Sequence, residues 1–205
     1  MVHETIQTVR LPSVEKSLHY FEDYKVPGNI KAHCFRVRDV SHFLAEHLFQ
    51  SGQHINIEFT DRLGLFHDLF KAVALAELKP NRFHSYVHTA EEVAMWKKLR
   101  EQYPNMNEGD VAYLVFKDDF PELALALKKV CNPRETVLSW EEKIVHYADW
   151  RVFQDTIVSL GERLVYLRER YPRIDNAWDL FEQKMRSLEQ DIFSRILFSP
   201  EKLKE

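Results

Sequence analysis

Three capping boxes, each a Ser or Thr followed three residues later by Glu, constrain this chain more than any other local feature. They are Thr89 with Glu92, Ser139 with Glu142, and Ser159 with Glu162. In such a box the hydroxyl accepts a hydrogen bond from the third amide of a helix, and the carboxylate accepts one from the amide of the cap residue. Apolar residues follow at intervals of three and four, the spacing of one helical face. We therefore predict an all-α protein.

Single residues suggest further helix ends. Ser13 precedes one apolar run, Gly52 follows another, and Pro104 and Pro172 each end a run. One predicted helix begins after Ser13. The others cover 30–50, 61–78 with Asp61 as its cap, 90–103, 110–116, 121–130, 140–154, 163–171 and 175–197. Since no linker rich in Pro, Gly or Ser interrupts them, residues 1–205 are expected to form a single domain. Its core would cover about 13–171, its C-terminal helix about 175–197, and the final SPEKLKE would be a solvated tail.

The composition excludes several function classes. The chain has only 5 Gly, too scattered to assemble a glycine-rich phosphate loop. Its 28 basic and 32 acidic residues lack the positive excess typical of nucleic-acid-binding domains. No stretch approaches the roughly 20 apolar residues of a membrane span, and the N-terminus does not resemble a signal peptide. We expect a soluble cytoplasmic protein with reduced thiols at Cys34 and Cys131.

The segment LGLFHDLFKAVALAEL, from Leu63 to Leu78, is apolar except for a few ionisable residues at its centre, chiefly His67, Asp68 and Lys71. A charge removed from water is costly unless it is paired, so these groups need partners. On the preceding helix His33 falls on the same stripe as several apolar residues, and on a later helix Asp149 shares a face with apolar residues. Two imidazoles and two carboxylates of this kind would suit a divalent transition ion.

Simpler interpretations exist for each group. An inward His such as His33 is more often a hydrogen-bonded core residue than a ligand. Asp149 could instead form a buried ion pair with Lys143 or Arg151. The remaining histidines, His146 among them, are expected on solvated faces or in ordinary contacts. Aromatic residues at helical spacing, Trp150 among them, are expected in the core or at an interface rather than in a base-stacking platform.

The motifs HCFRVRDVSHFLA, GLFHDLFKA and EEKIVHYADWRV occur in that order along the chain. Together they resemble the HD superfamily of metal-dependent phosphohydrolases, which has a His on one helix, an adjacent His-Asp pair on another and a distant Asp. The resemblance implies an HD-type helical bundle with a metal held by His33, His67, Asp68 and Asp149. The ion would be Fe, Mn, Co, Ni, Zn or Mg. The implied activity is hydrolysis of a phosphate ester, often of a nucleotide.

The same resemblance suggests roles for other residues. Asp68 and Lys71 are the catalytic candidates, because Lys71 lies four residues after His67 and its ammonium can reach the same pocket. Arg36 and Arg151, close in sequence to the ligands, are further candidates for binding phosphate. Relatives with two metals have two more histidines; His88 fits the first position, and Asp118 stands at the second. Asp118 could ligate a second ion, or the site could hold one ion with His88 contacting substrate.

Two functions follow as hypotheses. The first is a metal-dependent phosphohydrolase that acts on a nucleotide or another small phosphorylated metabolite through a metal-activated water. The second is a catalytically silent regulatory protein of the HD type that binds a metal or a nucleotide. The altered position at Asp118 favours the second. A homodimer is compatible with either hypothesis.

Overall fold

The computed structural model describes residues 9–132, 135–172 and 176–204, and almost all of their regular structure is helical. The all-α prediction is confirmed. The helices are α1 Val14–Asp23, α2 Gly28–Gln50, α3 Ile57–Phe66, α4 Lys71–Ala74, α5 Ala90–Gln102, α6 Glu108–Phe116, α7 Pro121–Val130, α8 Trp140–Arg151, α9 Leu160–Arg170, α10 Ala177–Phe193 and the 3-10 helix η1 Pro200–Lys204. The strands β1 Val152–Phe153 and β2 Thr156–Ile157 pair in an antiparallel ribbon.

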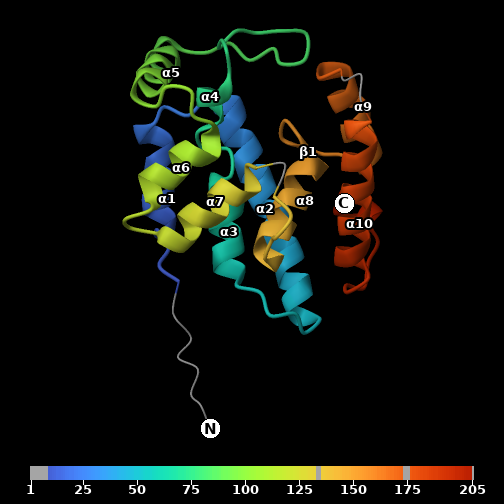
Figure 1. The fold of residues 1–205 in the computed structure, drawn as a ribbon. Coiled ribbons are helices and arrows are strands. Elements are labelled where there is room, and N and C mark those ends of the chain that lie inside the picture. Colours follow the sequence, from blue (N-terminus) through green and yellow to red (C-terminus); the bar gives the residue numbers. More distant parts are fainter. Residues whose placement is uncertain (1–8, 133–134, 173–175, 205) are drawn as a thin grey trace.

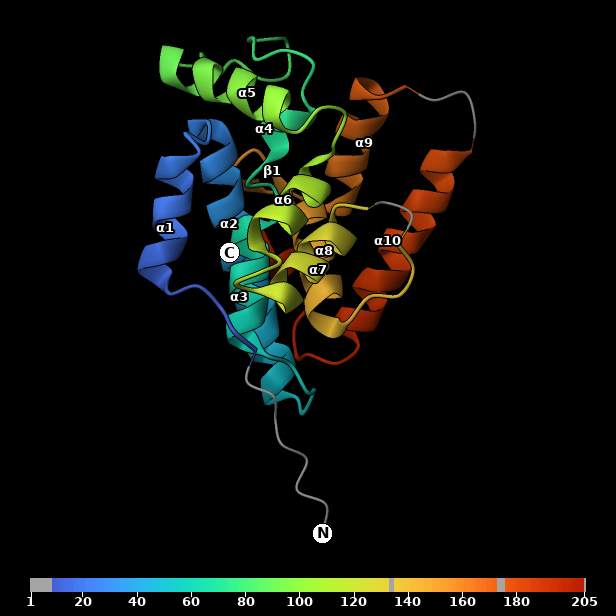
Figure 2. The same ribbon diagram turned by 60° about the vertical axis from the view of Figure 1, so that its left-hand side comes forward.

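Helices α2, α3 and α8 form the centre of the molecule, where each contacts the other two. Figure 1 shows α1, α6 and α7 on one side of this centre and α9 and α10 on the other. Figure 2 shows α5 across one end of the bundle. The core is therefore built where the consecutive helices α2 and α3 meet α8 from much later in the sequence, and polar groups on their inner faces are brought together.

The capping signals predict most helix starts correctly. All three capping boxes form, with both hydrogen bonds of each box present. Ser13 caps α1 by accepting a hydrogen bond from the amide of Lys16 at 3.1 Å. Gly52 follows the end of α2 with φ +90°, a left-handed conformation that glycine adopts without strain. Helix α2 begins slightly earlier than predicted, at Gly28.

The predicted helix over 61–78 is wrong in its start, its cap and its length. Asn56, not Asp61, caps α3, because its side chain accepts a hydrogen bond from the amide of Phe59 at 3.0 Å. Asp61 lies inside α3, only 3% exposed, and accepts a hydrogen bond from Arg38 Nε at 2.7 Å. The helix ends at Phe66, and a turn separates it from the short α4.

The predicted helix over 140–154 ends early, at Arg151, because the chain turns into the β1–β2 hairpin. Gln154 occupies that turn with φ +57°. The predicted start of the C-terminal helix, Asp175, lies outside the described residues, and α10 ends at Phe193 rather than near Leu197. The SPEKLKE segment is not simply a solvated tail, since it contains η1 and buries Leu203 in the core.

No helix of the described residues combines the length and the apolar character that crossing a membrane requires. Cys34 is buried and Cys131 partly buried, and both are free thiols, as predicted. Neither contributes a covalent link to the fold.

Candidate metal centre

Four side chains, from α2, from α8 and from the turn that follows α3, converge on one point. His33 lies on α2, on a stripe whose apolar members Val37 and Leu44 are fully buried. Asp149 lies near the C-terminal end of α8, next to the buried Ala148. The structure thus brings together all four predicted ligands, the other two being His67 and Asp68.

The break after α3 explains how two adjacent residues can face the same point. In a continuous helix, His67 and Asp68 would diverge by about 100°. Here His67 is the C-cap of α3 and Asp68 lies in the turn before α4. Both side chains can therefore face the cluster, which the predicted continuous helix would have made difficult.

The donor atoms of the cluster are close together. His33 Nε2 lies 3.0 Å from Asp149 Oδ1 and 3.4 Å from His67 Nε2. Asp68 Oδ2 lies 3.9 Å from His33 Nε2 and 3.8 Å from His67 Nε2, and Asp149 Oδ1 lies 3.8 Å from His67 Nε2. Ligand atoms about 2.1 Å from one shared ion lie roughly 3 Å apart, so a small inward movement would suffice for them to hold a cation.

Backbone carbonyls fix the proton positions of both imidazoles. His33 Nδ1 lies 2.8 Å from the carbonyl oxygen of Gln154, and His67 Nδ1 lies 2.8 Å from that of Gly64. A carbonyl can only accept, so each Nδ1 must carry the proton and donate it. Each Nε2 then faces the centre of the cluster, where it either carries a second proton and donates it to a carboxylate or, without that proton, offers its lone pair to a cation, as metal-ligating histidines do.

The electrostatics of the cluster favour positive charge. Burial lowers the pKa of His67, but Asp68 and Asp149 raise it by more, so the net pKa lies above its ordinary value. Burial raises the pKa of Asp149, but hydrogen bonds from the two imidazoles contribute to a larger opposing effect, so the net pKa lies well below its usual range. Two carboxylates and two lone pairs around one point therefore attract either protons or a cation.

His33, His67 and Asp68 form a group whose ligand atoms lie within 4.8 Å of one another, a geometry that can hold a metal ion. Asp149 adds a carboxylate oxygen close to both imidazoles. The alternative ion pairs of Asp149 do not form: Lys143 Nζ lies 3.3 Å from Asp191, and Arg151 binds Glu189. The residues present thus fit a divalent ion with mixed nitrogen and oxygen ligands.

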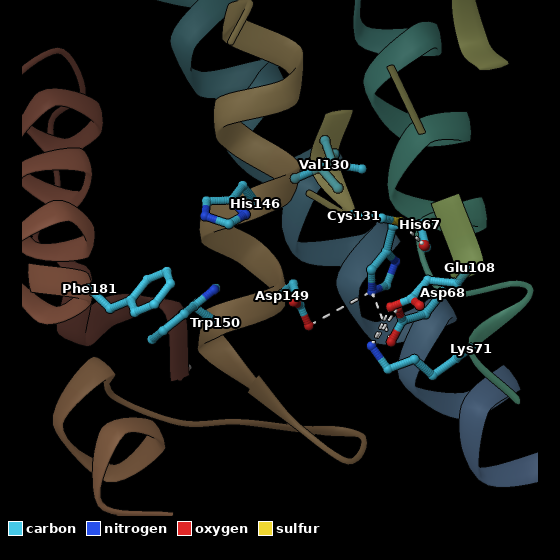
Figure 3. A pocket seen from close by; sticks show the side chains of 11 residues that line it. His67, Asp68, Lys71, Glu108, Val130, Cys131, His146, Asp149, Trp150 and Phe181 are labelled. Carbon is cyan, nitrogen blue, oxygen red and sulfur yellow. Dashed lines mark hydrogen bonds and ion pairs between the residues drawn. The ribbon is translucent and has the colours of Figure 1, made fainter. Parts of the chain in front are cut away.

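A cavity of about 260 Å³ opens beside the cluster (Figure 3). Its charged lining includes the predicted catalytic candidates Asp68 and Lys71, and also Glu108, which was not predicted. Lys71 Nζ lies 2.8 Å from Glu108 Oε1 and 3.5 Å from Asp68 Oδ1. The carboxylate of Asp68, with a smaller contribution from Glu108, raises the pKa of Lys71 well above its ordinary value against the opposing effect of burial. Lys71 is therefore an ammonium ion.

The sequence indicates the position of Glu108 at the start of a helix but not its contact with Lys71. Asn107 caps α6 and puts Glu108 in the first turn of that helix. That signal is visible in the sequence, but its partner Lys71 is distant along the chain. His146, expected on a solvated face or in an ordinary contact, and Trp150, expected in the core or at an interface, both line the cavity.

The predicted phosphate-binding arginines are not in the cavity. Arg151 is 1% exposed, and its guanidinium donates to the carbonyl oxygens of Val158 and Pro200 at 2.6 and 3.0 Å. This contradicts a role in substrate binding, because the guanidinium is buried and its hydrogen bonds go to other groups of the protein. Arg36 is exposed and donates from Nε to the carbonyl oxygen of Asp155 at 2.8 Å.

The predicted second-metal residues do not join the cluster either. His88 Nδ1 lies 3.6 Å from Glu92, and its ring contacts Tyr86, which binds the amide of Gly28. Asp118 is exposed in the turn that follows α6. Neither residue lines the cavity, so the described residues provide ligands for one ion there.

Comparison with known proteins adds no relative: no family model, no curated protein and no solved structure matches this chain. The chemistry of the cluster is therefore the basis for any statement of function.

Proposed function

We propose that this protein is a metal-dependent phosphohydrolase of the HD type, acting on a nucleotide or another small phosphorylated metabolite. One observation carries the proposal. The resemblance to the HD superfamily names His33, His67, Asp68 and Asp149 as ligands, and these four side chains lie together with each Nε2 atom 3.0–3.9 Å from oxygen atoms of the two carboxylates. The cavity beside them supplies room for a small ester.

A divalent cation bound there would lower the pKa of a water towards about 7 and neutralise charge on a phosphoryl oxygen. The residues themselves supply the remaining functions. Asp68 Oδ2 faces the imidazoles while its Oδ1 lies 3.5 Å from Lys71 Nζ. In the proposed reaction Oδ1 would accept a proton from the water activated at the cluster. The ammonium of Lys71 provides positive charge for the substrate phosphate.

Glu108 positions Lys71 rather than touching substrate. Its carboxylate is partly buried and lies 2.8 Å from Lys71 Nζ, which keeps the ammonium beside Asp68. A cavity of about 260 Å³ lies just below the common range of about 300–1,000 Å³ for ligand pockets, and this favours a small substrate.

The experiment combines metal analysis with a phosphate-release screen. Purified protein is analysed for bound metal and then incubated with nucleotides and sugar phosphates in the presence of Mn, Co, Ni or Mg. We expect turnover that Asp68→Ala abolishes. Asp118→Ala, which removes an exposed carboxylate outside the cavity, is the matched control and should retain both metal and turnover.

Three results decide the matter. Metal-dependent turnover lost in Asp68→Ala and kept in Asp118→Ala supports the proposal. Metal binding with no turnover on any phosphoester would support the catalytically silent regulatory protein instead. Absence of both metal binding and turnover would remove both functions.

A further inference from the structure

The cavity has two chemically different walls. Asp68, Lys71 and Glu108 form the charged wall, next to the metal cluster. The opposite wall is apolar and aromatic, and its members come from α7, α8 and α10. Figure 3 shows His146, Trp150 and Phe181 on the α10 side of Asp149, with the charged side chains on the other side. A ligand in this cavity therefore meets charge at one end and aromatic surface at the other.

Two aromatic rings dominate the second wall. Trp150 directly follows the ligand Asp149 on α8, and its ring lies 6.2 Å from that of Phe181 on α10, with 26° between their planes. Both side chains are only partly buried although both line the cavity. Half-covered aromatic surface beside a charged cluster offers a stacking surface to a flat ligand.

On this aromatic wall, His146 is the one side chain among the residues that line the cavity whose ring nitrogen can accept a hydrogen bond. It is 9% exposed, and its Nε2 has no hydrogen-bond partner among the described residues. A buried polar atom without a partner typically destabilises a fold. Burial lowers the pKa of His146 to about 4, with the charges of Asp149 and Lys184 as smaller influences, so the ring is uncharged at neutral pH. An uncharged imidazole next to Trp150 suits a neutral hydrogen-bonding group on a ligand.

We propose that the cavity binds a phosphate ester whose leaving group carries a flat, uncharged heteroaromatic ring, as a nucleoside does. The ring stacks on Trp150 and Phe181, and its edge forms a hydrogen bond with Nε2 of His146. The placement of the phosphate at the charged wall rests on the proposed function. The ring-binding wall does not, because binding alone can test it.

The test compares nucleosides with ribose, which has the same sugar and no ring system. Neither has a phosphate to be cleaved, so calorimetric titration reports binding only. We expect at least one of the four common nucleosides to bind at least about tenfold more tightly than ribose, in line with the contribution of base stacking on aromatic side chains. In Trp150→Leu this preference should fall by about tenfold. Trp140→Leu is the matched control, because Trp140 lies on the same helix but outside the cavity, and it should keep the preference.

His146→Phe tests the hydrogen bond while keeping a flat ring in the buried position. We expect it to weaken binding of the preferred nucleoside about fivefold relative to ribose. Thermal melts check that each variant is folded. The inference is overturned if no nucleoside is preferred over ribose, or if Trp150→Leu keeps the full preference. An unchanged affinity in His146→Phe overturns the role of Nε2. If nucleosides bind as expected but no ester is hydrolysed, the inference stands and the proposed phosphohydrolase function fails.

Discussion

The direction of each side chain, rather than its place in the sequence, decides which residues belong to the site. Arg151 lies two residues after Asp149, which turns it by about 200° around α8 and directs it to the other face of the helix. There it binds Glu189 and the carbonyl oxygens of Val158 and Pro200. Proximity in sequence therefore gave a wrong candidate for phosphate binding.

Arg151→Met should destabilise the protein without affecting metal binding. Removing the guanidinium takes the charged partner from Glu189, which keeps its hydrogen bond from the Tyr147 hydroxyl, and a donor from two carbonyl oxygens. Breaking a buried pair in this way costs about 3 kcal/mol of the free energy of unfolding. Urea unfolding measures this loss, and metal titration measures affinity. A fall in metal affinity of more than about twofold in the folded variant would mean that Arg151 acts on the cluster.

His146 should make stability depend on pH in the acid range. Its pKa is about 4 in the folded protein, below the ordinary 6.5, so the unfolded chain takes up the proton first as the pH falls. The stability contributed by the neutral imidazole is fully present above about pH 6.5 and is lost towards pH 4. Between these values the wild type should lose about 3 kcal/mol more than His146→Phe, measured by urea unfolding at each pH. Parallel curves for the two proteins would contradict the buried, neutral state.

The four candidate ligands could be found from sequence because helical stripes and a resemblance in motif order point to them. Helical periodicity places His33 and Asp149 on inner faces, and both do lie with buried apolar neighbours. The orienting carbonyl oxygens of Gly64 and Gln154 could not be found, since every residue has a carbonyl. His146 and Glu108 were missed because their importance depends on the cavity, which long-range packing creates.

At the scale of the helix, local signals predict starts well where a side chain caps its own amides. They fail at α3, where the sequence offers two residues, Asn56 and Asp61, that could each cap the start of the helix. Asn56 caps the helix, whereas Asp61 is held within it by Arg38, which lies 23 residues earlier in the sequence. No local pattern shows that partner. The break before α4 and the turn at Gln154 likewise have distant partners: the thiol of Cys131 donates to the carbonyl oxygen of His67, and the side-chain amide of Gln154 donates to that of Phe83.

Gly64→Ala should push α2 and α3 apart. A Cβ at this position would lie 3.1 Å from the Cα of Arg38 and 3.1 Å from Oγ of Ser41, both on α2. Overpacking of this kind costs about 1–3 kcal/mol. Because the carbonyl of Gly64 orients His67, metal affinity should fall as well.

Urea unfolding and metal titration of Gly64→Ala measure both effects. Gly161→Ala is the matched control, since the nearest atom to its added Cβ is Ser159 Oγ at 3.9 Å. Alanine favours helix there, so this control should be neutral or slightly stabilising. Unchanged stability and unchanged metal affinity in Gly64→Ala would contradict the close contact between the two helices.

At the scale of the whole molecule, the cluster joins segments from position 33 to position 149, so an ion bound there would stabilise only the folded chain. At a free metal concentration one hundred times the dissociation constant, the gain is about 2.7 kcal/mol. For a chain of this size, that corresponds to a rise in Tm of roughly 5–10 °C. A chelator should reverse the rise.

Asp149→Asn removes one carboxylate of the cluster and should abolish most of this metal-dependent rise in Tm, while Asp118→Asn should keep it. Differential scanning fluorimetry across a series of metal concentrations makes the comparison. Equal rises in Asp149→Asn and in the wild type would show that the stabilising ion binds elsewhere.

Both imidazoles of the cluster are aimed by oxygen atoms that belong to the main chain, at positions 64 and 154. A substitution can displace such an oxygen but never delete it. Replacing Gln154 with alanine would therefore leave the oxygen that aims His33 in place, and an alanine scan would reveal the candidate ligands while overlooking this support. At position 154, an insertion, a deletion or a change of the hairpin would be needed to expose that dependence.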